Sequence, residues 1–249
     1  MKPSLLSTIS LALLSTTLAA SFTLAGAPGG GPGGGGRGRG GGGAPAAPRG
    51  PAPSLTAVST PTTPTDPDGF IRRWIILEPI PAQGVTEAAI QAAVKKEYFP
   101  NQLTVIPKDG DKVTVDGAEL TWHAYDSKNF NFSTYHFSFF LGKPTNNVLW
   151  WAVTVVNAPE EMKDVRLAIG SNDCSVWWVD GKEVIGHYGD RPDIYDDAVS
   201  KKLTLHKGPN VVRVAVHNQQ GATDFCARFL DKDDHPIKNL TVSLSPDLK

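Results

Sequence analysis

The sequence has few of the features that mark an enzyme or a metalloprotein. Only two of its 249 residues are cysteine, and its six histidines are scattered without a pair at zinc-ligand spacing. It contains no G-x-S-x-G elbow, no H-E-x-x-H, no P-loop, and no G-x-G-x-x-G between a strand and a helix. The adjacent acid pairs Glu160-Glu161 and Asp233-Asp234 resemble solvated loops rather than the opposed carboxylates of a glycosidase. These absences argue against catalysis.

The sequence also lacks a strong charge of either sign. Its formal net charge is −1. Residues 1–69 hold four basic and two acidic side chains, so the remaining 180 residues carry a net charge of −3. A mildly acidic domain has no electrostatic footprint for nucleic acid, which is therefore not expected as a partner.

The first 27 residues predict a signal peptide. Lys2 precedes an uncharged apolar run, and Ala25 and Ala27 fit the small-residue pattern of a cleavage site. Cleavage after Ala19, Ala20 or Ala25 is equally arguable, and a membrane anchor is the competing interpretation, although serine and threonine interrupt the run. We expect an exported protein, periplasmic, cell-surface or extracellular, with no integral membrane span in its mature form.

Residues 28–68 are rich in glycine and proline and have almost nothing apolar to bury. Such a composition does not offset the entropy lost on ordering, so this segment is expected to be a disordered linker. Its "GRGRGGGG" core is similar to an RGG-type segment that binds nucleic acid. However, it carries few charges and no interleaved aromatic residue, which favours a tether.

Residues 69–249 predict one all-β domain, a jelly-roll β-sandwich with one short helix. Short apolar-alternating runs rich in Val, Ile, Trp, Phe and Thr are separated by turn signals. The predicted strands are 70–78, 120–126, 133–142, 148–157, 165–170, 174–180, 182–187, 201–206, 210–218 and 224–231. Asp116-Gly117 and Asp180-Gly181 predict tight hairpin turns. The helix is expected over 86–99, capped by Thr86 and stopped by Pro100.

Four stretches carry a resemblance to a known family: "FIRRWIILEPIP", "VRLAIGSND", "SVWWVDGKEV" and the closing run from "KKLTLHKGPNVVRVAVHN" to "HPI". Together they resemble galactose-binding-domain-like jelly-roll modules of exported bacterial proteins, with a PA14-like hairpin pattern. The resemblance covers most of residues 70–240 and implies a β-sandwich binding module. Glu78 and Ile80 depart from the family's usual Gly and Phe at the exit of the first strand.

Two tryptophans, Trp177 and Trp178, stand side by side in "SVWWVDG". Successive side chains of a strand point to opposite faces, so the two rings have different surroundings. Trp177 shares a face with Val179 next to the turn and is assigned to the core. Trp178 is then exposed or half-exposed, as a platform for a sugar ring, or it packs under the following loop or against the helix at 86–99. The same parity places Trp150 and Trp151 on opposite faces, both in the core.

The loop that follows this hairpin, "GHYGDRPDIYDD", supplies polar candidates for a binding site. With Trp178, the predicted ligand-binding residues are His187, Tyr188, Asp190, Arg191 and Asp193. The loop's carboxylates are hard oxygen ligands suited to calcium, but they lack the spacing of a dedicated calcium loop, and aspartates that cap turns are the alternative. No metal or other cofactor is therefore assigned.

The two cysteines, Cys174 and Cys226, are a disulfide candidate because exported proteins favour such bonds. Both are expected to point away from the core, and a bond requires their Cα atoms to lie within about 7 Å. Two inert thiols are the alternative.

Two functions from different classes remain open. The first is an exported, non-catalytic module that binds carbohydrate or another cell-surface polymer through loops and Trp178. The second is a structural or assembly domain of the cell envelope that binds a protein partner.

Overall fold

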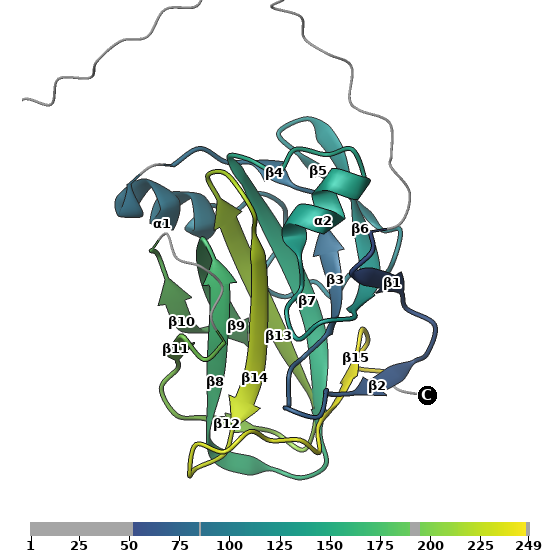
Figure 1. The fold of residues 1–249 in the computed structure, drawn as a ribbon, viewed down its shortest axis with the longest axis vertical. Coiled ribbons are helices and arrows are strands. Elements are labelled where there is room, and N and C mark those ends of the chain that lie inside the picture. The colour runs from purple at the N-terminus through teal and green to yellow at the C-terminus, as the bar shows by residue number, and fades with distance from the viewer. Residues whose placement is uncertain (1–51, 85, 190–194, 248–249) are drawn as a thin grey trace, which may run out of the picture. The chain divides into compact units, whose positions relative to one another are not determined.

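The computed structural model describes residues 52–84, 86–189 and 195–247 (Figure 1). The predicted signal peptide, and the predicted linker up to residue 51, lie outside the described residues. No helix within these ranges has the length and apolar character needed to cross a bilayer. The elements are β1 Leu55–Ala57, β2 Thr62–Pro64, β3 Arg73–Leu77, β4 Ile80–Pro81, α1 Glu87–Lys95, β5 Lys112–Val115, β6 Ala118–Ser127, α2 Thr134–Phe140, β7 Val148–Ala158, β8 Met162–Asn172, β9 Cys174–Val179, β10 Lys182–His187, β11 Ala198–Val199, β12 Leu203–Leu205, β13 Gly208–Asn218, β14 Asp224–Leu230 and β15 Thr241–Ser243.

Two antiparallel sheets face each other, which confirms the predicted all-β sandwich. In the described chain, the larger sheet has the strand order β1-β6-β3-β7-β13-β9-β10, with shorter strands paired along its sides. The smaller sheet places β14, β11 and β12 against β8. Figure 1 shows β8 and β14 in front of the larger sheet. A chain of alternating apolar positions forms such layers because each sheet buries one face against the other.

The first hydrophobic core fills the space between the sheets. It contains Trp74, Trp150 and Trp177 from the larger sheet, and Phe225 and Phe229 from β14. The rings of Trp74 and Trp177 meet edge to face at 5.9 Å, and Phe225 contacts both. These aromatic side chains account for much of the apolar area that stabilises the sandwich.

A second core covers the other face of the larger sheet. Ile90 and Val94 of α1 pack there with Trp151 and Trp178, and α1 lies against β9 and β13. The segment after α1 adds to this cover, since the Arg213 guanidinium donates from Nε to the Leu103 carbonyl at 2.8 Å. The central strands of the larger sheet are therefore buried on both faces, as the uninterrupted burial of β3 and β9 shows.

The helix α1 forms close to the predicted place. Thr86 caps it by accepting a hydrogen bond from the Ala89 amide at 3.2 Å, and Lys95 is its last residue. Pro100 therefore lies beyond its end. Its buried residues, four apart, face the sheet as expected for an amphipathic helix.

The strand predicted over 133–142 is wrong, because this segment forms the helix α2. Ser133 caps α2 by accepting a hydrogen bond from the His136 amide at 3.1 Å. The buried residues Thr134, Phe137 and Ser138 recur at the spacing of a helix, not at the alternation of a strand. The prediction of a single helix fails for the same reason.

The predicted start of the domain at residue 69 is also wrong, because ordered structure begins earlier. The strands β1 and β2 both lie within the predicted linker 28–68. β1 pairs with β6 and β2 pairs with β15, so this part of the predicted linker belongs to the larger sheet. Leu55 enters the first core, and the buried Arg73 guanidinium donates to the Thr60 carbonyl at 2.7 Å. We refer to residues 52–66 as the N-terminal arm. Its backbone pairs with strands far along the chain, which no local pattern announces.

Both predicted hairpin turns are confirmed. Asp116 and Gly117 have φ of 48° and 84°, and Asp180 and Gly181 have φ of 48° and 76°. Positive φ at both central residues is the geometry that favours Asp-Gly between paired strands.

Candidate functional site

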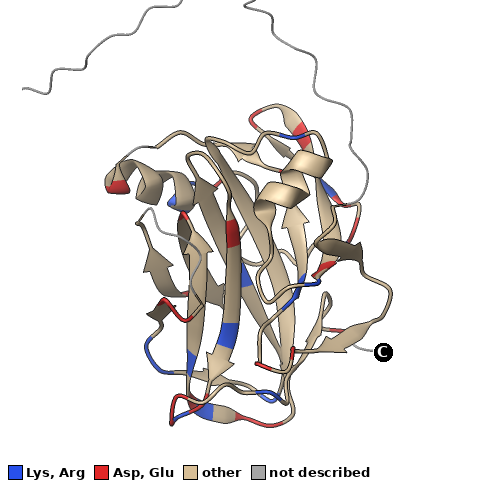
Figure 2. Ribbon diagram, viewed as in Figure 1, with Lys and Arg blue, Asp and Glu red and all other residues tan. Residues whose placement is uncertain are grey.

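The most distinctive surface in the described residues lies on the outer face of the smaller sheet. Side chains of β14 alternate: Phe225, Ala227 and Phe229 enter the first core, so Arg228 points the other way. In Figure 2 the charged positions gather mainly at strand ends and connections, whereas β14 carries both signs along the strand. Asp224 and Arg228 therefore place charge of both signs on the outer face of β14.

Arg228 is held in place by an ion pair and a backbone contact. Its Nε and Nη2 donate to the Asp196 carboxylate, with Nε 3.0 Å from Oδ1, and Nη1 donates to the Asp68 carbonyl at 2.9 Å. These hydrogen bonds to Asp196 are the main reason that the pKa of Arg228 lies above its usual value. A guanidinium held by a bidentate ion pair and by a hydrogen bond to a backbone carbonyl is rigid, unlike a mobile surface charge.

Aromatic rings surround this arginine. The Arg228 guanidinium lies 4.6 Å from the ring centroid of Phe70 and 5.6 Å from that of Tyr195. Phe130 completes the group, with its ring 5.2 Å from Phe70 and 6.2 Å from Tyr195. We call Phe70, Phe130, Tyr195 and Arg228 the aromatic–arginine cluster.

The cluster presents apolar surface to solvent. Tyr195 is 58% exposed and Phe130 is 38% exposed. Among the described residues, the only other large hydrophobic side chains that are exposed are Leu103 and Val199. Val199 pairs with Ala168 of β8, which also pairs with Arg228, so Val199 extends the same outer face. Exposed apolar groups collected in one place indicate a contact surface.

This arrangement can bind a ligand with both apolar and polar edges. A guanidinium has five N–H donors, and an ionised carboxylate accepts up to about four hydrogen bonds. The contacts between Arg228 and Asp196 therefore leave donors and acceptors for a ligand lying against the Tyr195 ring. Flat rings beside fixed polar groups provide stacking and orientation together.

The prediction that Trp178 is exposed is wrong. Its side chain is only 5% exposed, and its ring stacks on Trp151 with centroids 5.1 Å apart. The parity argument itself is confirmed, because Trp177 lies in the first core and Trp178 in the second. The alternative in which Trp178 packs against the helix is the correct one. Trp178 therefore cannot serve as a surface platform.

Of the other predicted ligand-binding residues, the structure describes only His187 and Tyr188. Tyr188 packs into the second core, where burial raises the pKa of its phenol. His187 pairs with Ser175 in the sheet register, which places it on the face opposite Trp178. Asp190, Arg191 and Asp193 lie outside the described residues.

The proposed disulfide between Cys174 and Cys226 is not present. Both thiols are buried, and no bond joins them. Cys174 belongs to the larger sheet and packs into the second core, whereas Cys226 lies on the smaller sheet, on the side away from the first core. Both side chains point away from the shared core, as predicted. Because they belong to different sheets, that parity places them on opposite sides of the sandwich.

Metal-binding groups are not assembled in the part of the chain that the structure describes. No three His, Cys, Asp or Glu side chains gather there in a way that could hold an ion.

Glu78, where the sequence departs from the Gly usual in the family it resembles, forms ion pairs in the structure. Its buried carboxylate lies 2.9 Å from the Lys143 Nζ and 3.4 Å from the His123 Nε2, which ties the exit of β3 to the segment after α2.

The sequence contained partial signals for the cluster. Tyr195 and Asp196 belong to the polar loop that the sequence singled out. The alternation within 224–231 places Arg228 on the outer face beside Cys226. Nothing local links these residues to Phe70 and Phe130, which come from distant segments. Their proximity depends on how the two sheets stack.

No protein-family model and no curated protein matches this sequence. Solved structures that are similar to it include the PA14 domain of the MpAFP antifreeze protein, with 12% sequence identity and a TM-score of 0.43, covering 78% of this chain and 100% of that one. A PA14 sugar-binding domain from an RTX adhesin has 14% identity and a TM-score of 0.36, covering 68% of this chain and 96% of that one. A β-glucosidase from Kluyveromyces marxianus in complex with glucose has 16% identity and a TM-score of 0.34, covering 50% of this chain and 16% of that one.

Proposed function

We propose that the protein is an exported, non-catalytic module that binds carbohydrate through the aromatic–arginine cluster. The observation that carries this proposal is the exposure of Tyr195 and Phe130 around the fixed Arg228–Asp196 pair. The apolar face of a sugar ring packs on an aromatic ring, and its hydroxyls need fixed donors and acceptors at the rim. The cluster supplies both on one face of the sandwich.

In this proposal the aromatic–arginine cluster, rather than Trp178, is the platform on which the sugar ring packs. The proposed ligand class stays the same, a carbohydrate or cell-surface polymer, while the platform moves from the larger sheet to the outer face of the smaller one. Tyr195 is the central residue, since it is the most exposed of the three rings and touches the other two.

Affinity electrophoresis on a panel of neutral and acidic polysaccharides tests the proposal. We expect at least one polysaccharide to retard the wild-type protein, and Tyr195→Ala to raise the apparent Kd by about tenfold or more. Such a change corresponds to about 1.4 kcal/mol, and loss of an aromatic contact together with its buried area accounts for it.

Two further variants make this experiment specific. Tyr195→Phe keeps the ring and should keep most of the retardation. Leu103→Ala removes another exposed hydrophobic side chain, far along the chain from the cluster, and should leave the Kd unchanged. Wild-type protein that no glycan retards would refute carbohydrate binding. Retention of a stoichiometric envelope protein that depends on Tyr195 would then identify the surface as a protein-binding one.

A further inference from the structure

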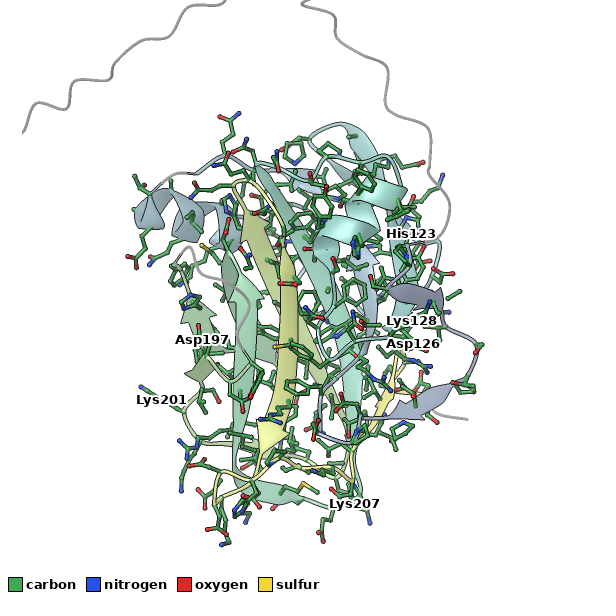
Figure 3. All side chains as sticks on the ribbon, in the orientation of Figure 1. His123, Asp126, Lys128, Asp197, Lys201 and Lys207 are labelled. Carbon is green, nitrogen blue, oxygen red and sulfur yellow. The ribbon has the colours of Figure 1, made fainter. Side chains whose placement is uncertain are left out.

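A small polar hollow lies where the N-terminal arm meets the start of β3 and the end of β6. It has a volume of about 240 Å³ and is lined by Thr56, Thr63, Arg72, Asp126, Ser127 and Lys128. Figure 3 shows the labelled Asp126 and Lys128 next to each other on the side of the sandwich where β1 lies. Because β1 and β2 supply two of the lining threonines, the hollow exists only when the arm is in place.

The charges around this hollow favour an anion. Asp126 is the one carboxylate of the lining, and it is already paired with Arg73, whose Nε and Nη2 each lie 2.8 Å from its oxygens. Arg72 and Lys128 then remain as two cations. The Lys128 Nζ donates to the Pro53 carbonyl at 2.9 Å, a contact that does not neutralise its charge.

Arg72 makes no use of its guanidinium within the described chain. Its Nε is buried and has no hydrogen-bond partner there, and no described carboxylate pairs with it. An arginine presents five donors in a fork that matches a planar oxyanion, and leaving such donors unmet is unfavourable. Thr63 also lines the hollow, and a threonine hydroxyl can donate one more hydrogen bond.

The hollow and the aromatic–arginine cluster share two stretches of chain. Phe70 of the cluster and Arg72 of the hollow are two residues apart, and so are Phe130 and Lys128. Two residues of extended chain span at most about 7 Å. The backbone at Arg72 and Lys128 therefore lies within that distance of the backbone at Phe70 and Phe130.

We infer that the ligand is an acidic polysaccharide, whose sulfate or carboxylate group occupies this hollow between Arg72, Lys128 and Thr63. The inference rests on the proposed function, because the cluster supplies the contact with the sugar rings. The hollow selects acidic over neutral polymers, and the cluster contributes affinity for both.

The experiment compares dextran sulfate and alginate with neutral dextran in affinity electrophoresis at low salt. We expect wild-type protein to bind an acidic polymer at least about tenfold more tightly than neutral dextran. Arg72→Gln should remove most of this preference, Thr63→Val should reduce it, and salt should weaken it by screening. Lys207→Gln removes one positive charge from an exposed position elsewhere (Figure 3) and should keep the preference. Unfolding temperatures of all variants confirm that each one folds.

The outcomes separate this inference from the proposed function. If the wild type binds dextran and acidic polymers equally, or if Lys207→Gln and Arg72→Gln lower the preference equally, the hollow is not a specific site while the cluster still stands. If free sulfate stabilises the wild type but not Arg72→Gln, and no acidic polymer binds, the inference is overturned; the proposed function is overturned with it only if no neutral polysaccharide binds either. Loss of acidic-polymer binding in both Arg72→Gln and Tyr195→Ala, with Lys207→Gln unaffected, supports the inference.

Discussion

Replacement of Trp178 by alanine should destabilise the fold rather than remove a ligand contact. The Trp178 ring is 5% exposed and stacks on Trp151 across the second core. A buried tryptophan removes about 150–250 Å² from water, which at about 25 cal/mol per Å² corresponds to roughly 4–6 kcal/mol as an upper bound. Alanine keeps a small part of that area and leaves a cavity beside Trp151. We therefore expect Trp178→Ala to lower the free energy of unfolding by about 3–5 kcal/mol.

Thermal and urea unfolding measure this effect directly. For a domain of this size, each kcal/mol shifts the melting temperature by about 2–4 °C, so the expected decrease is about 6–20 °C. Trp178→Phe retains an aromatic ring and should lose less, while Tyr195→Ala, at an exposed position, should change stability by no more than about 0.5 kcal/mol. The polysaccharide affinity of the folded fraction of Trp178→Ala should equal that of the wild type. A variant with normal stability and lost glycan retardation would refute this reasoning and restore Trp178 as a ligand platform.

Three other predictions follow from the fold. Deletion of residues 52–66 removes β1, β2 and the first-core residue Leu55, so the melting temperature should fall by at least several degrees. An unchanged melting temperature would show that the N-terminal arm does not pack on the domain. Cys174 and Cys226 should react with a thiol reagent only after unfolding, and the chain should migrate identically with and without reductant. If both cysteines of the unfolded protein react only after a reductant is added, they form a disulfide and the prediction is wrong. Burial lowers the pKa of His217, so its contribution to stability is present above the unfolded value of about 6.5 and is lost as the pH falls below it. Urea unfolding between pH 7.5 and 5 should therefore show a smaller loss of stability for His217→Asn than for the wild type, and equal pH dependences would disprove the assignment.

Several elements of this fold could be predicted because their signals are local. Asp-Gly pairs demand positive φ, and alternation of apolar residues in 148–157 and 210–218 matches the period of a strand. The same alternation placed Trp177 and Trp178 on opposite faces, correctly. Parity is a property of the backbone, so it holds whatever covers each face.

The errors have two causes, the first of which is that alternation does not say what lies over a face. Parity alone leaves two environments for Trp178, solvent or a cover over the outer face of the sheet. Here α1 and the segment after it form a third layer over the larger sheet, and that layer buries Trp178. The helix at 134–140 was assigned as a strand because aromatic residues are common in both, and only its capping and packing separate the two.

The sequence by itself determined the class of the domain, the two Asp-Gly turns, the cap of α1, and the opposite faces of Trp177 and Trp178, because these depend on backbone geometry within a few residues. The tertiary structure alone decided which faces are covered, and it brought Phe70, Phe130, Tyr195 and Arg228 together. It also showed that Cys174 and Cys226 lie on different sheets, and that residues 52–66 belong to the fold. Each of these depends on contacts between segments tens to more than a hundred residues apart, whose free energy comes from the burial of one sheet against another rather than from any local preference.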